Sequence, residues 1–167
     1  MKIHIIGGSG TGKSYISEKI CQQYSISHFD LDDIFWDNTA ESYGTKMPID
    51  KRIERLRTIL KNDDWIIEGV FYDWLSDSFS SADYIFILKT SPFIFNSRII
   101  KRFIRRRFGL EKSKKETLKS LKDLLVWTNN YQKSKIPKIL DFLEPYKEKT
   151  IILDNSKEIF DYISPAK

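Results

Sequence analysis

The chain contains a single cysteine, Cys21, among its 167 residues, which excludes a disulfide within the chain. Such sparse use of cysteine suits a reducing compartment, so we expect a cytoplasmic protein. Long apolar runs are lacking too, because no stretch approaches the roughly 18 apolar residues of a membrane span. The apolar run after Lys2 ends after four residues, which is too short for the core of a signal peptide. These absences predict a protein without a membrane association.

Internal repeats, low-complexity tracts and interdomain linkers are also absent, and the length suits a single domain, residues 1–167. Charge is divided unevenly along this domain. Residues 1–97 carry 10 Lys/Arg and 14 Asp/Glu, whereas residues 98–167 carry 18 and 9. An acidic half beside a basic half suits a site in which carboxylates hold Mg²⁺ and cations cover phosphates. The same division also suits binding to nucleic acid.

A glycine-rich loop lies between a predicted strand, Lys2–Ile6, and a predicted helix, Lys13–Tyr24. Residues 7–14 read G-G-S-G-T-G-K-S and match the phosphate-binding P-loop pattern G-x-x-x-x-G-K-[ST] at every fixed position. Glycines let the backbone approach a ligand closely, and the N–H groups at the helix start favour an anion. The residues expected to bind the nucleotide are Gly8, Ser9, Gly10, Thr11, Gly12, Lys13, Ser14 and Tyr15.

Two residues of this loop have expected chemical roles. Lys13 should reach the β- and γ-phosphates of ATP, and the hydroxyl of Ser14 should ligate Mg²⁺. The loop therefore predicts ATP and Mg²⁺ as the cofactors. The guanine-reading signature Asn-Lys-x-Asp is lacking, which argues against a GTPase.

Strands alternate with helices along the rest of the chain, which predicts an α/β fold: a mainly parallel sheet with helices on both faces. Further strands are expected at Ser25–Phe29, Trp65–Glu68, Tyr84–Leu88 and Lys149–Leu153. Helices are expected after Pro48, over Pro92–Phe108, through Leu118–Tyr131, after a boundary at Ile136–Pro137, and after Asn155. Residues 37–62 and 103–135 are longer than simple crossovers need, so we predict an acceptor-binding flap and a lid-like insertion there.

Three acids follow predicted strands: Asp30 and Asp32 come after the second, and Glu68 ends the third. Ligands gather at the carboxyl ends of parallel strands, so these acids should converge near Lys13 and Ser14. Asp32 is the first choice for the group that accepts the proton of an acceptor hydroxyl. Asp30 or Glu68 could hold Mg²⁺ through water. In the alternative interpretation Asp30 only caps the following helix and Glu68 is a solvated strand end.

Aromatic residues flank the same predicted edge of the sheet. Trp36, together with Asp32, Glu68 and Gly69, is expected to hold the acceptor. Further candidates for stacking against it, each of which also suits ordinary packing, are Tyr43, Phe71, Tyr72 and Trp74.

The predicted helix Pro92–Phe108 carries six Lys/Arg and no acid. Arg98, Arg102, and Arg105 or Arg106 form one stripe of this helix. Arginine forks onto phosphate oxygens and stays charged, so we expect Arg98, Arg102 and Arg106 to act on the transferred phosphoryl group. A solvated basic face and a nucleic-acid footprint are the alternatives.

Taken together, the P-loop, the aspartate after the second strand, the pair Glu68-Gly69 and the arginine-rich helix resemble the nucleoside-monophosphate-kinase-like P-loop kinases. More narrowly, Leu31–Trp36, Trp65–Gly69 and the Arg98–Arg107 helix resemble adenylate-kinase-like proteins of the DNA topology modulation (FlaR-related) group. The resemblance covers most of residues 1–108. It implies a five-stranded parallel sheet in the order 2-3-1-4-5, ATP with Mg²⁺, and transfer of the γ-phosphoryl group.

The chain also departs from these families. Adenylate kinases carry Asp-Gly-Phe-Pro-Arg after the third strand, where this chain has Glu68-Gly69-Val70-Phe71-Tyr72, so the arginine that grips an acceptor phosphate is absent. The Asp30/Asp32 pair resembles that of shikimate kinases and favours a hydroxyl acceptor, although their glycine triplet is absent. The expected function is phosphoryl transfer from ATP to a small nucleoside, nucleotide or other hydroxyl compound, by a monomer or homodimer. The alternative is an ATP-binding regulator that binds nucleic acid and modulates DNA topology.

Overall fold

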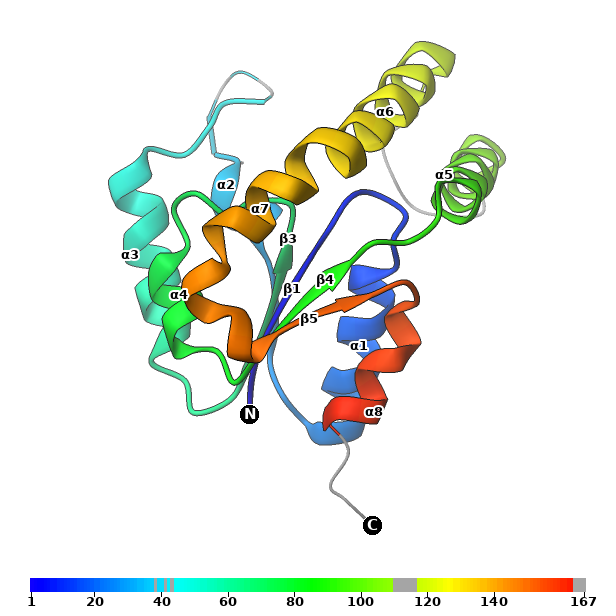
Figure 1. The fold of residues 1–167 in the computed structure, drawn as a ribbon. Coiled ribbons are helices and arrows are strands. Elements are labelled where there is room, and N and C mark those ends of the chain that lie inside the picture. Colours follow the sequence, from blue (N-terminus) through cyan, green and yellow to red (C-terminus); the bar gives the residue numbers. More distant parts are fainter. Residues whose placement is uncertain (38, 41, 43, 110–116, 164–167) are drawn as a thin grey trace.

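A five-stranded parallel sheet forms the centre of the molecule (Figure 1). The computed structural model describes residues 1–37, 39–40, 42, 44–109 and 117–163. Within them the strand order is β2-β3-β1-β4-β5, which confirms the predicted fold class and topology. The strands are β1 (Lys2–Gly7), β2 (His28–Asp30), β3 (Trp65–Gly69), β4 (Tyr84–Leu88) and β5 (Thr150–Leu153).

Helices cover both faces of this sheet (Figure 1). One face is covered by α1 (Lys13–Tyr24) and α8 (Ile159–Ile163), and the other by α3 (Ile49–Leu60), α4 (Ser76–Ser81) and α7 (Ile136–Phe142). Near the carboxyl ends of the strands lie α2 (Leu31–Phe35), α5 (Pro92–Arg107) and α6 (Leu118–Asn130). Shorter turns are η1 (Tyr131–Lys135), η2 (Glu144–Lys149) and η3 (Ser156–Glu158).

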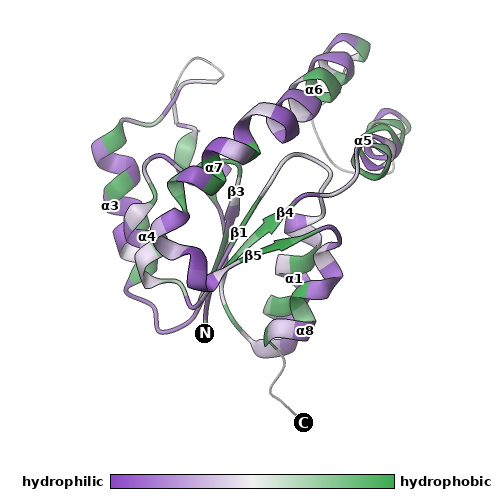
Figure 2. Ribbon diagram, viewed as in Figure 1, coloured by the Kyte–Doolittle hydropathy of each residue, from purple (hydrophilic) through white to green (hydrophobic). Residues whose placement is uncertain are grey.

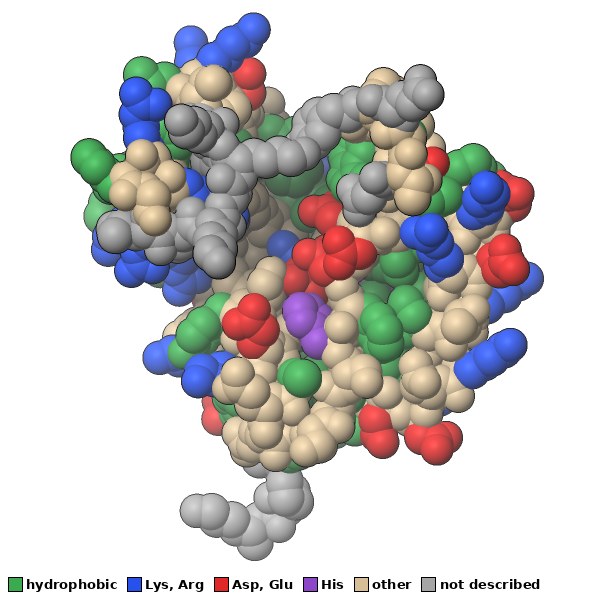
Figure 3. Space-filling view, turned by 180° about the vertical axis from the view of Figure 1, so that it is seen from behind, with side chains coloured by type: hydrophobic (Ala, Val, Ile, Leu, Met, Phe, Trp, Pro, Cys, Tyr) green, Lys and Arg blue, Asp and Glu red, His purple; other side chains and the backbone are tan. Residues whose placement is uncertain are grey.

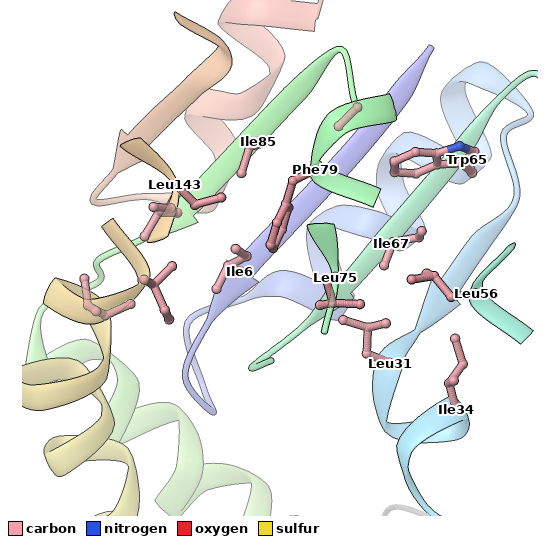
Figure 4. Packing of buried hydrophobic residues seen from close by; sticks show 14 of the residues in the cluster. Ile6, Leu31, Ile34, Leu56, Trp65, Ile67, Leu75, Phe79, Ile85 and Leu143 are labelled. Atoms are coloured by element: carbon pink, nitrogen blue, oxygen red, sulfur yellow. The ribbon is translucent and has the colours of Figure 1, made fainter. Parts of the chain in front are cut away.

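The strands are apolar on both sides because helices cover both sides. Side chains alternate along a strand, so Ile5 of β1 belongs to the core under α1 and α8, whereas Ile6 belongs to the opposite core. Figure 4 shows that second core, where Phe79 of α4 and Leu75 pack between the sheet and the surrounding helices. In Figure 2 strands β4 and β5 are hydrophobic, and the helices around the sheet carry both hydrophilic and hydrophobic residues. The sheet is therefore held between two buried layers, and the loops that follow the strands lie at its carboxyl-terminal edge.

The predicted boundary at Ile136–Pro137 falls where η1 gives way to α7, but the chain does not leave the helical conformation there. Ile136 has φ −56° and ψ −45°, and its N–H donates to the carbonyl of Tyr131, five residues earlier. Pro137 lies in the first turn of α7. The wider π-helical turn admits a proline, which an unbroken α-helix would exclude because the ring lacks an N–H and clashes with the preceding turn.

Two smaller differences concern β2 and α4. β2 begins at His28, not at Ser25, because Ser25 adopts a left-handed conformation with φ 57° at the end of α1. The strand ends at Asp30, one residue later than predicted. The short helix α4 was not predicted from the sequence.

Substitution of Phe86 by alanine should lower the free energy of unfolding by about 3–5 kcal/mol, because loss of the fully buried ring would leave a cavity in the core beside β4. Phe93→Ala is the matched control, since its ring is 84% exposed on α5 and its loss should cost no more than about 0.5 kcal/mol. Urea denaturation followed by circular dichroism measures both. Equal losses in the two variants would contradict the assigned core.

Candidate active site

The loop between β1 and α1 has a backbone that requires glycine. Gly10 and Gly12 have φ angles of 75° and 100°, a region that other residues adopt only with strain. A Cβ on Gly10 would come within 2.7 Å of the Phe95 carbonyl oxygen. A Cβ on Gly12 would come within 2.8 Å of the Ser156 hydroxyl. The loop therefore has the glycine-dependent backbone that the P-loop pattern predicts, and a side chain at either position would collide with α5 or with the segment after β5.

Glu68, in β3, joins two functional residues of that loop. The Ser14 hydroxyl donates to Glu68 Oε1 at 2.5 Å, and Lys13 Nζ lies 3.7 Å from Oε2. Lys13 also donates to the carbonyl oxygen of Gly8 at 3.1 Å. Because the Ser14 hydroxyl donates its hydrogen bond to Glu68, the lone pairs of its oxygen remain available to a cation. Glu68 is only 1% exposed, so the interpretation of this residue as a solvated strand end is wrong.

His28 is a third neighbour of Glu68. Its Nε2 lies 3.6 Å from Glu68 Oε1, across the pairing of β2 with β3. Burial alone would raise the pKa of Glu68, but His28, Lys13 and Ser14 together hold that pKa below its usual range. Figure 3 shows acidic side chains gathered beside a histidine in the middle of this face. The sequence analysis missed His28, because only the pairing of the two strands places it there.

Asp30 and Asp32 lie at the end of β2 and in the first turn of α2. Asp30 Oδ1 accepts a hydrogen bond from the backbone N–H of Asp32 at 2.9 Å, so Asp30 does cap α2. Burial, and then the nearby charge of Glu68, raise the pKa of Asp30 to about 6. Desolvation also raises the pKa of Asp32, while Lys13 acts in the opposite direction. Three carboxylates thus share one site with the ammonium group of Lys13.

A cavity of about 770 Å³ opens at this edge of the sheet, within the usual size range of small-ligand sites. Most of the predicted site residues line it: Ser9, Gly10, Gly12, Lys13, Ser14, Tyr15, Asp30, Asp32, Trp36, Glu68, Gly69, Arg98 and Arg102. Gly8, Thr11 and Arg106 do not. Lining residues that the sequence analysis did not single out include Phe35, Lys46, Leu124 and Trp127.

Arginines of α5 reach the phosphate-binding loop. Arg98 Nη1 donates to the carbonyl oxygens of Gly10 at 3.2 Å and Thr11 at 3.1 Å. Arg102 Nη2 donates to the Ser9 hydroxyl at 3.2 Å. The predicted stripe therefore brings two guanidinium groups to the site.

Both predicted insertions contribute to the cavity. In residues 103–135, Leu124 and Trp127 of α6 line it. In residues 37–62, Lys46 lines it, and a backbone bridge to Trp36 holds this segment. Tyr43 lies outside the described residues. Of the other predicted aromatics, Phe71 lines the cavity, whereas Tyr72 packs against Phe142.

A second cavity of about 370 Å³ lies beside the loop, lined by Gly12, Tyr15, Arg98, Asn155, Ser156 and Lys157. Its residues come from α1, α5 and the segment after β5. The sequence carried no motif for it, since the three segments meet only in the folded chain.

The residues present suit a magnesium–nucleotide complex better than a metal held by protein alone. Among the described residues, no group of three or more His, Cys, Asp or Glu is placed to hold a metal ion. Mg²⁺ usually keeps its waters and binds through one or two protein oxygens and the phosphates of its ligand. Ser14, Glu68 and Asp30 beside the glycine-rich loop fit that kind of site.

Within the described part of the chain, no helix has the length and apolar character needed to cross a membrane.

Comparisons with known proteins establish the fold. No family model matches the sequence. YqaC of Bacillus subtilis (strain 168), described as uncharacterised, is 29% identical over 87 residues, which span 52% of this chain and 47% of that protein. The match therefore covers about half of that relative's length.

Two solved structures were compared with the chain. A shikimate kinase from Bacteroides thetaiotaomicron superposes with a TM-score of 0.60 and 12% identity over 99% of both chains. A gluconokinase from Sinorhizobium meliloti 1021 has a TM-score of 0.48 and 19% identity over 91% of this chain and 81% of its own. At this level of identity, the likeness to the shikimate kinase shows that the chain has the fold of a P-loop kinase. The narrower resemblance to the DNA topology modulation group stays a prediction.

Asp30→Asn should stabilise the metal-free protein at pH 7.5 by on the order of 1 kcal/mol, after allowance for solvent screening. An acid whose folded pKa is raised from 3.8 to about 6 destabilises the fold once it ionises, so this cost grows as pH rises from 4 to 6. Asparagine caps a helix as well as aspartate does. Urea denaturation in chelator at several pH values should show a gain that disappears near pH 4. A constant gain would contradict the raised pKa.

Proposed function

We propose that this protein is an ATP-dependent kinase that transfers the γ-phosphoryl group to a hydroxyl group of a small molecule. One observation carries the proposal: the P-loop residues Lys13 and Ser14, the carboxylates of Asp32 and Glu68, and the guanidinium of Arg102 line one cavity. Phosphoryl transfer needs these groups, namely cations for the phosphates, oxygen ligands for Mg²⁺ and a base for the acceptor. The fold shared with a shikimate kinase supports the same conclusion.

The nucleotide would extend over two neighbouring cavities. The loop with Lys13 would bind the β- and γ-phosphates, because its N–H groups and the start of α1 favour an anion. The second cavity, between Tyr15 and Asn155, would take the base. Mg²⁺ would be held by Ser14 directly and by Glu68 and Asp30 through water, and when bound it would neutralise charge on the phosphates.

The oxygen of the acceptor hydroxyl would bond to the γ-phosphorus as ADP leaves. Asp32 would accept the proton of that hydroxyl. A pKa above the usual range brings this carboxylate closer to the working pH of a general base. Lys13, Arg98 and Arg102 would stabilise charge on the transferred group. These three cations contact Glu68 or loop oxygens, which supports their place beside the proposed phosphate site.

The basic half of the chain is the basis of the alternative function, a nucleic-acid-binding regulator. Two arginines of that half, Arg98 and Arg102, contact the P-loop. This arrangement supports a role at the nucleotide phosphates and favours the kinase.

A coupled assay of ADP release, run over nucleosides, nucleotides and small alcohols, tests the proposed reaction. We expect at least one acceptor to give ADP and a phosphorylated product in equal amounts. Calorimetry with ATP and Mg²⁺ is the companion measurement. ATP bound without stimulation by any acceptor would argue against a kinase.

Lys13→Ala should lower turnover with such an acceptor by about 100-fold or more, because one preorganised cation at the developing charge is lost. Its melting temperature should stay close to that of the wild type. Lys19→Ala is the matched control, an exposed lysine on the same helix α1. Near-normal turnover of a folded Lys13→Ala protein would refute the site.

Asp32→Asn should lower kcat by roughly 10²–10⁴-fold, the usual contribution of general base catalysis, while the affinity for ATP changes little. Asp33→Asn is the control, because Asp33 is the next residue of α2 and does not line the cavity. Single-turnover kinetics separate the chemical step from product release. Equal rates for the two variants would show that Asp32 is not the base.

A further inference from the structure

One wall of the cavity is aromatic. The rings of Phe35 and Phe71 stack with centroids 4.0 Å apart and an interplanar angle of 16°. Trp36 packs edge-on against Phe35, with centroids 4.8 Å apart. All three rings are half-buried and line the cavity, along with Val70. A ligand that enters here meets apolar surface formed by the end of α2, which carries Asp32, and by the segment after β3.

This wall is held in place from behind. The Arg52 guanidinium lies 4.5 Å from the centroid of Phe35, and its Nε donates to the Met47 carbonyl oxygen at 2.6 Å. The Met47 N–H in turn donates to the carbonyl oxygen of Phe35 at 2.9 Å. A rigid wall that exists before binding lowers the entropy cost of binding a flat ligand.

Cations are unevenly distributed around the cavity. Lys13, Arg98 and Arg102 lie at the P-loop, so the nucleotide phosphates would occupy them. On the aromatic side Lys46 is the one lysine or arginine that lines the cavity among the residues described, and its Nζ lies 5.7 Å from the Phe35 centroid. A single ammonium suits a single anionic group. Among the described residues, this side of the cavity has no arginine for the bidentate grip that often recognises a phosphate monoester.

Among the described residues, hydrogen-bonding groups are also few on this side. Phe35, Trp36, Phe71 and Val70 offer mostly carbon surface, and a polyhydroxylated acceptor would bury its hydroxyls against it without partners. Unpaired polar groups cost about 1–3 kcal/mol each. The wall therefore discriminates against sugars and favours an acceptor with an apolar body.

We propose that the acceptor is a flat, largely apolar hydroxyl compound with one anionic group. Its body would lie against Phe71 and Trp36, its anionic group near Lys46, and its hydroxyl near Asp32. This inference rests on the proposed kinase function. In the reaction the hydroxyl proton passes to Asp32, the hydroxyl oxygen bonds to the γ-phosphorus, and the bond from that phosphorus to the bridging oxygen of ADP breaks.

Binding of matched probes to the protein with Mg²⁺ and a non-hydrolysable ATP analogue tests this inference. The probes are para-hydroxymethyl benzoate, benzyl alcohol, the cyclohexane analogue of the first, AMP and glucose. Calorimetry should show that para-hydroxymethyl benzoate binds about tenfold or more tightly than each of the others. ADP release should follow the same order in the presence of ATP.

Lys46→Gln should weaken binding of para-hydroxymethyl benzoate about tenfold and leave benzyl alcohol unaffected, because only the first probe carries the anion. Lys51→Gln is the matched control, an exposed lysine on α3 outside the cavity. An equal effect of Lys46→Gln on both probes would contradict the proposal that the acceptor carries an anionic group near Lys46.

Other outcomes separate the inference from the proposed function. Tighter binding of AMP or glucose, with ADP release, would overturn the acceptor class and leave the kinase intact. Binding of none of the probes below about 10 mM would overturn the acceptor class as well. Failure of the ATP analogue to bind would overturn the proposed function and the inference together.

Discussion

The site depends on one buried carboxylate, that of Glu68. A buried ionised acid is costly unless it is paired and hydrogen-bonded, and here Ser14, Lys13 and His28 supply the partners. Ser14 and Lys13 belong to α1, and His28 belongs to β2. The charge of Glu68 in β3 therefore links three segments at this edge of the sheet. Burial, together with the same charge, raises the pKa of Asp30.

Much of this arrangement could be predicted from the sequence. The P-loop is a local pattern with fixed spacing, and the alternation of strands and helices predicted a parallel sheet. The strand order, which the structure confirms, was implied only by the resemblance to P-loop kinases. The convergence of Asp32 and Glu68 followed from the rule that parallel strands end at one edge. The remaining features depend on contacts between distant segments: His28 meets Glu68 only through strand pairing, and Lys46 enters the cavity only through its bridge to Trp36. The π-helical turn before Pro137 likewise has no signature in the local sequence.

The cavity combines two chemical environments. On the loop side, backbone N–H groups, Lys13 and two arginines suit a polyphosphate, and Arg98 also connects this side to the second cavity. On the other side, stacked aromatic rings and one lysine form a wall of different character. Asp32 lies on the helix that continues into the aromatic wall, where the two environments meet. The loop side follows the general P-loop pattern, whereas the aromatic side is formed by residues outside that pattern.

We propose that Glu68 couples the P-loop to a magnesium-bound nucleotide. Calorimetric titration of ATP, with and without Mg²⁺, into the wild type and a Glu68→Gln variant is the decisive experiment. We expect Mg²⁺ to tighten ATP binding to the wild type by about tenfold or more, and the folded variant to lose most of this gain. An equal effect of Mg²⁺ on the two proteins would show that Glu68 has no part in binding the magnesium–nucleotide complex.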